Sequence, residues 1–116
     1  MVGCGGFVGA VARYLLSKAV AVDGWPVGTL CVNILGCLLI GLLMGLSERH
    51  SWFSPTLTAL LVTGFCGAFT TFSTFANELF QSAHSGHLLT ALAYLAASLV
   101  GGLLAVVAGR ALATQL

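Results

Sequence analysis

The chain has 116 residues, of which 59% are hydrophobic and 6% are charged, and its mean hydropathy is +1.06. Soluble domains carry about 25% charged residues, so this chain has too few charges to cover a water-facing surface, and lipid must be its main solvent. The net charge is +1 and no basic run occurs, which excludes the charge pattern of a nucleic-acid-binding protein. Because each membrane helix needs about 20 residues, we expect about four spans in a single transmembrane domain over residues 1–116, with no soluble domain.

The first predicted span runs from about Gly3 to Val22. It opens GCGGFVGAVARY, and small residues of this kind let neighbouring helices approach closely in lipid. No Lys or Arg precedes the apolar stretch, which also continues beyond the length of a signal-peptide core. We therefore interpret it as a membrane span and not as a signal peptide.

The second predicted span runs from about Pro26 to Leu46. Proline suits the first turn of a helix, where its missing N–H removes no hydrogen bond. The polar residues of this span, Thr29 and Asn33, are four apart and therefore lie on one helix face.

The third predicted span covers residues 55–81 and the fourth covers residues 88–111. Within the third, the segment GFCGAFTTFSTF (64–75) places glycines before clustered hydroxyl and aromatic residues, which are poor helix formers. We expect the helix to break between Gly67 and Thr71. Broken backbone at membrane depth is tolerated only inside protein or beside water.

The basic residues predict no preferred orientation. With four spans, Arg49 and Arg110 fall on one side of the membrane, whereas Lys18 and Arg13 fall on the other. A chain balanced in this way can insert in both directions, which would permit an antiparallel dimer. A single orientation fixed by other features is the alternative, and charge alone does not decide between them.

No credible catalytic set is present, so we expect no enzyme. Asp23 and Glu48 fall in loops, as do the three histidines. His84 and His87 are three apart, but two histidines alone make a weak metal site. The four cysteines lie in apolar stretches without a CxxC pattern, and we interpret them as small packing residues.

Polar residues within spans are often only interhelical hydrogen-bond partners, worth about 0.6 kcal/mol each. That interpretation suits Thr63 and Ser98. It suits the segment TTFST (70–74) less well, because four hydroxyls in five residues exceed what helix packing requires.

The same segment has features that suit a small anion. Thr71, Thr74 and Glu78 follow i, i+3, i+7 spacing and can form a polar track, with Phe72 and Phe75 on an adjacent stripe. Hydroxyl groups donate hydrogen bonds, and aromatic rings are positive at their edges. Neutral donors and ring edges suit an anion that must shed its water, although helix packing remains the commoner role of phenylalanine in membranes.

Three segments of the chain resemble the Fluc/CrcB family of fluoride channels: GGFVGAVARY, GTLCVNILG and GFCGAFTTFSTF. They occur in the family's order over nearly the whole length. The resemblance implies an all-α integral membrane protein with four transmembrane helices, the third broken near its middle. It also implies an antiparallel, dual-topology homodimer in the cell inner (plasma) membrane, with two pores that export fluoride passively from the cytoplasm.

The resemblance further implies roles for individual residues. The implied pore residues are Thr29, Asn33, Thr71, Phe72, Ser73, Thr74, Phe75 and Tyr94. Arg13 and Glu78 would lie in vestibules at the pore mouths. A structural sodium ion at the dimer centre would be bound by the backbone carbonyls of Gly67 and Thr70 from both subunits.

Two alternative functions explain the sequence less well. A small four-helix multidrug exporter driven by protons needs a carboxylate deep in the first span, where this chain has only Arg13 as an ionisable group. An assembly subunit that transports nothing would need no polar track, so it leaves the TTFST segment unexplained.

Overall fold

The computed structural model describes residues 1–20 and 25–116. The predicted end of the first span at Val22 lies outside the described residues, as does Asp23. The elements in chain order are α1 (Val2–Ala19), α2 (Val27–Arg49), α3 (Pro55–Thr58), the π-helix η1 (Ala59–Cys66), α4 (Gly67–Phe69), α5 (Ser73–His84) and α6 (Leu88–Ala113). Over these two ranges the all-α prediction is confirmed, with four helices if α3 to α5 are counted as one interrupted helix.

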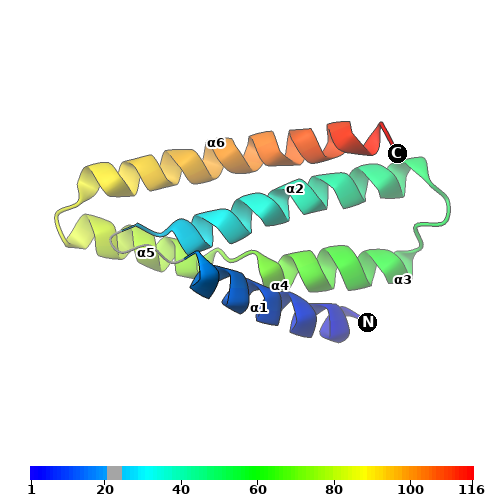
Figure 1. The fold of residues 1–116 in the computed structure, drawn as a ribbon, viewed down its shortest axis with the longest axis horizontal. Helices are drawn as coiled ribbons and strands as arrows, with labels where there is room; N and C mark the ends of the chain where they lie inside the picture. Colours follow the sequence, from blue (N-terminus) through cyan, green and yellow to red (C-terminus); the bar gives the residue numbers. More distant parts are fainter. Residues whose placement is uncertain (21–24) are drawn as a thin grey trace.

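The helices form an elongated bundle of 51 × 27 × 20 Å (Figure 1). Helices α2 and α6, which run parallel, share the most extensive contact. Helix α1 packs against η1 and α4, and α5 packs against the first part of α6. Met1 and Leu116 lie at the same end of the bundle, as an even number of helices that alternate in direction along the chain requires.

Within the described part of the chain, three segments are long and apolar enough to cross a membrane: Val27–Arg49, Pro55–His84 and Leu88–Ala113. The chain is therefore an integral membrane protein with at least three candidate spans. Helix α1 is less apolar, because its 18 residues include several glycines and the cations Arg13 and Lys18. At 1.5 Å per residue it is about 27 Å long, close to the thickness of a bilayer's hydrocarbon core.

Glycines bring the helix backbones into direct contact. A Cβ added at Gly41 would overlap a backbone oxygen of α6, and one at Gly109 would overlap a backbone oxygen of α2. On the other side of the bundle, a Cβ at Gly5 or Gly9 would overlap backbone oxygens of η1. Because lipid provides little hydrophobic drive between helices, this close packing is what holds the bundle together.

The third helix breaks later than the sequence predicts. Gly67 is helical, with φ −61° and ψ −38°, and the helix continues through Phe69. Thr70 then becomes extended, with φ −85° and ψ 159°, and helical structure resumes at Ser73. The break therefore occupies residues 70–72 and not 67–71, because tertiary hydrogen bonds, and not the glycine, set where the helix ends.

Candidate ion pathway

The break is fixed from α2 by the side chain of Asn33. Asn33 Oδ1 accepts a hydrogen bond from the Thr71 N–H at 2.8 Å, and Asn33 Nδ2 donates to the Thr71 carbonyl at 3.0 Å. One primary amide thus satisfies both backbone groups of a residue that has left the helix. Because an Asn amide carries two N–H donors, one donor remains for a further partner.

Arg13 holds the same region from α1. Its Nε donates to the Ala68 carbonyl at 2.9 Å, and the side chain is half-buried. A cation near the last carbonyls of a helix is favourable for electrostatic reasons as well. The structure therefore places Arg13 as a brace between α1 and the end of α4.

Carbonyl oxygens are released where the helix breaks, among them those of Gly67 and Thr70. In a continuous helix the Gly67 carbonyl would accept from the Thr71 N–H, and the Thr70 carbonyl from the Thr74 N–H. The Thr71 N–H donates instead to Asn33 Oδ1, and the Thr74 N–H donates to Thr71 Oγ1 at 3.4 Å. Carbonyl oxygens freed in this way are suitable ligands for a hard cation.

An open cavity of about 600 Å³ lies against the break, between α2, η1 and α6. It brings together four of the predicted pore residues and both residues of the predicted sodium site. Its lining comprises Asn33, Gly36, Cys37, Ile40, Val62, Thr63, Cys66, Gly67, Thr70, Thr71, Phe72, Phe75, Ser98 and Leu99. Polar groups of the break thus line a space whose other lining residues are mostly apolar.

Three aromatic rings lead away from this cavity. The ring centroids of Phe72 and Phe75 are 6.1 Å apart, and those of Phe75 and Tyr94 are 5.0 Å apart with an edge-on angle of 71°. Phe75 and Tyr94 are buried, whereas 78% of Phe72 is exposed. The two phenylalanines, treated as equivalent from the sequence, therefore occupy different environments.

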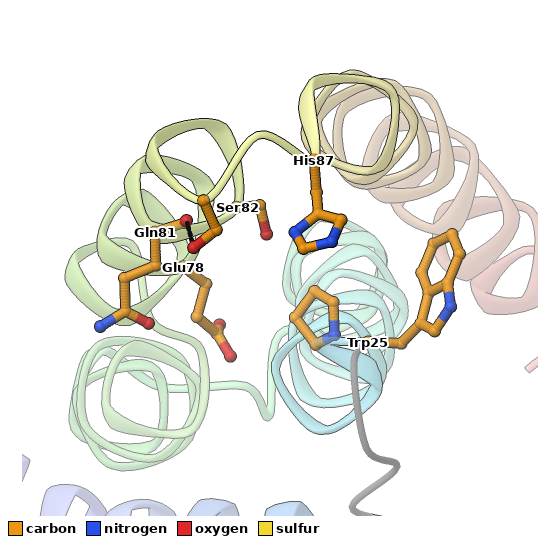
Figure 2. A pocket seen from close by; sticks show the side chains of 7 residues that line it. Trp25, Glu78, Gln81, Ser82 and His87 are labelled. Carbon is orange, nitrogen blue, oxygen red and sulfur yellow. Dashed lines mark hydrogen bonds between the residues drawn. The ribbon is translucent and has the colours of Figure 1, made fainter.

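A second pocket, of about 240 Å³, is lined by residues of α5, of the turn that leads into α6 and of the segment before α2 (Figure 2). The end of α5 and the start of α6 lie at the end of the bundle opposite the termini (Figure 1). We call this second pocket the mouth pocket; its lining is Trp25, Pro26, Glu78, Gln81, Ser82, Ser85 and His87. Glu78 Oε1 accepts a hydrogen bond from the Tyr94 hydroxyl at 3.1 Å. This contact links the mouth pocket through Tyr94 and Phe75 to the cavity at the break.

The predicted polar track is wrong in one respect. Thr71 was placed on a common helix face with Thr74 and Glu78, but it lies in the break, and its hydroxyl oxygen caps the start of α5. Ser73 and Thr74 are exposed on α5 in the single chain, and Thr29 is buried in α2. These residues lie outside the lining of the cavity.

Nearly the whole chain is similar to one known protein family. A family model described as "CrcB-like protein, Camphor Resistance (CrcB)" matches residues 1–110.

The chain belongs to the CrcB-like family.

Relatives of this CrcB-like chain include a "Fluoride-specific ion channel FluC" from Chlorobium phaeobacteroides, 46% identical over 97% of the chain and 90% of the relative. A protein of the same name from Stutzerimonas stutzeri is 45% identical over 97% of the chain and 93% of the relative. Another from Leptospira interrogans is 45% identical over 89% of the chain and 84% of the relative. The resemblance to the Fluc/CrcB family is confirmed, and so is the prediction that the chain is no enzyme. Relatives that match nearly the whole chain are named as ion channels.

Ser98 of this CrcB-like chain differs from the interhelical hydrogen-bond partner that the sequence predicts. Its Oγ is buried and has no hydrogen-bond partner among the described residues. It lines the cavity at the break. Its position four residues after Tyr94, on the same face of α6, was a signal that could have identified it.

Proposed function

We propose that the chain is a fluoride-selective channel that exports F⁻ passively from the cytoplasm across the cell inner (plasma) membrane and relieves fluoride toxicity. Relatives named as fluoride-specific ion channels match it over nearly its whole length. The observation that carries the proposal is the arrangement at the break. The Asn33 amide, with one donor to spare, lines the same cavity as Phe72 and Phe75.

The chemistry of the break suits selectivity for a small anion. Fluoride reaches the cell as neutral HF in acidic surroundings, ionises at neutral pH and is trapped as F⁻. In a narrow path, neutral donors and ring edges can replace part of the water bound to fluoride. The path carries no full positive charge that would retain other anions. Export then follows the electrochemical gradient and needs no ATP.

The proposed pore wall consists of the residues implied by the resemblance. Asn33 donates to the ion, and the edges of Phe72 and Phe75 flank it. Hydroxyls of the same path complete the set: Thr29, Thr71, Ser73, Thr74 and Tyr94. Arg13 and Glu78 act at the vestibules, Arg13 by attracting anions and Glu78 beside the mouth pocket.

The functional unit that we propose is an antiparallel, dual-topology homodimer with two pores, in which α1 is the fourth span of each subunit. Two features support this. The cavity at the break is open in the single chain, and α5 leaves polar residues such as Ser73, Thr74 and Asn77 exposed although it belongs to a candidate span. Lipid would not solvate these groups, whereas a second copy or water would.

A structural sodium ion at the dimer centre fits the donor set. The carbonyls of Gly67 and Thr70 have lost their helical donors, and both residues line the open cavity. Two copies of this pair, one from each subunit, would supply oxygen ligands to a hard cation. When bound, such an ion would attract and coordinate carbonyl oxygens of both subunits, and would so hold their broken third helices together.

The test is fluoride efflux from liposomes that contain the purified protein, with chloride as the control anion. Fluoride flux without chloride flux supports the proposal, and the absence of fluoride-selective flux contradicts it. Asn33→Asp and Phe72→Ile are expected nearly to abolish flux while the dimer stays intact. Unchanged flux in both variants would refute the assignment of the pore.

A further inference from the structure

Two ionisable side chains line the mouth pocket: one is acidic, Glu78, and the other is basic, His87. Figure 2 shows the Glu78 carboxylate, from α5, and the His87 ring, from the start of α6, both directed into the space between these helices and α2. Glu78 is half-buried and bound by Tyr94, whereas His87 is exposed to water. Any ion that passes between this pocket and the aromatic rings moves close to both groups.

The position of His87 is fixed by the turn between α5 and α6. Its backbone N–H donates to the Ser82 carbonyl at 2.9 Å, and its carbonyl accepts from the Ala91 N–H at 3.0 Å. Gly86, with φ +86°, supplies the left-handed conformation that this turn requires. The backbone of His87 is therefore held at the pocket from both neighbouring helices.

The described residues bring few other charges to the surroundings of His87. Among the described lining residues of the mouth pocket, Glu78 is the only other ionisable side chain. Trp25 and Pro26, which precede α2, carry no ionisable side chain. On α6, the Tyr94 hydroxyl is engaged with Glu78. His84 of α5 is absent from the lining and stacks on Phe80 at 5.5 Å, while Lys18 of α1 lies over the Tyr14 ring.

We propose that His87 is a further residue of the conduction path, which sets how readily an anion enters the mouth pocket and makes conduction depend on pH. This inference rests on the proposed function. When the imidazole is neutral, the ionised Glu78 repels an approaching anion. When the imidazole is protonated, its charge offsets that of Glu78, and the local concentration of anions rises.

The expected size is modest, because the pocket is wet. One unit charge several ångströms from the path, in a high dielectric, changes ion access by roughly threefold. The effect should fade at an ionic strength of about 1 M, where the Debye length falls to about 3 Å. If a buried pore residue were protonated instead, salt would screen its effect on the ion far less.

The experiment measures fluoride current across planar bilayers, at the same pH on both sides. Current is used because neutral HF, which crosses lipid at low pH, carries none. We expect the current at pH 5.5 to be about three times that at pH 8. His87→Gln should show the lower current at both pH values, and His87→Arg should show the higher current at both.

His84→Gln is the matched control, since this exposed histidine lies three residues before His87, at the end of α5, and does not line the pocket. It should retain the pH dependence of the original chain. The inference is overturned if the current does not depend on pH, if His87→Gln retains the dependence, or if His87→Arg fails to raise the current at pH 8. A misfolded variant cannot mimic that gain. Absence of fluoride current at every pH would instead refute the proposed function and the inference with it.

Discussion

Asn33 Oδ1 lies 2.8 Å from the Thr71 nitrogen and Asn33 Nδ2 lies 3.0 Å from the Thr71 oxygen. One side chain of α2 therefore replaces the backbone partners that Thr71 loses when the third helix breaks. The same contact fixes the direction of the remaining Nδ2 donor. The stability of the break and the orientation of a proposed pore donor are thus determined together.

Asn33→Leu should lower both stability and conduction. The change leaves the N–H and C=O of Thr71 without their partner at a half-buried site, at a cost of about 1–3 kcal/mol. Thermal denaturation in detergent and fluoride flux in liposomes measure the two effects. Asn77→Leu, at an exposed position on α5, is the control and should change stability little. Equal stability losses in the two variants would show that the contact with Thr71 contributes nothing.

The two phenylalanines should respond differently to substitution. Phe75 is 8% exposed and meets Tyr94 edge-on, so Phe75→Ile should cost about 1–2 kcal/mol of stability. Phe72 is 78% exposed in the single chain, so Phe72→Ile should leave the melting temperature of the monomer nearly unchanged. Both should reduce fluoride flux at least tenfold if both rings line the pore. Loss of flux in Phe75→Ile alone would remove Phe72 from the proposed pore wall.

Arg13→Lys distinguishes a brace from an attracting charge. Lysine retains the positive charge but not the Nε donor that reaches the Ala68 carbonyl at 2.9 Å. If the hydrogen bond matters, Arg13→Lys should lower the melting temperature nearly as much as Arg13→Gln. If only the charge matters, Arg13→Lys should behave like the original chain. The flux of both variants, measured over a range of ionic strength, shows any contribution of charge to anion access.

Gly41→Ala should strongly destabilise the bundle. The added methyl group would overlap a backbone oxygen of α6, so the helices would have to separate, with an expected loss of at least about 2 kcal/mol. Gly3→Ala is the control, because nothing lies within 4 Å of its added Cβ and alanine favours helix formation. Similar melting temperatures for the two variants would contradict the close contact between α2 and α6.

The helices could be predicted because each long apolar run leaves a clear signal. The described ends of α2 and α6 lie within about three residues of the predicted spans, where helix ends commonly fray. The break could also be anticipated, since clustered hydroxyl and aromatic residues follow glycines. Its position could not, because the hydrogen bonds of Asn33 to Thr71 join residues 38 apart in sequence. Local propensity contains no information about such a contact.

The π-helical stretch Ala59–Cys66 was likewise outside the reach of the sequence argument. Its residues read as an ordinary apolar helix, and the altered winding accompanies the close contact with α1 at Gly5 and Gly9. For the candidate pathway, the residue types at the break were recognisable, whereas the buried hydroxyl of Ser98 and the mouth pocket required knowledge of how α6 packs. Function was therefore more accessible from sequence than the geometry that supports it.

The shared location of the two termini limits how two copies could be encoded together. Met1 and Leu116 lie at one end of the bundle, so a short tandem fusion would insert both repeats in the same direction. A gene duplication that preserved an inverted pair would have to acquire a connector that crosses the bilayer once more. Without such a connector, duplicated genes would have to remain separate and diverge in their flanking charges, each copy committing to one orientation.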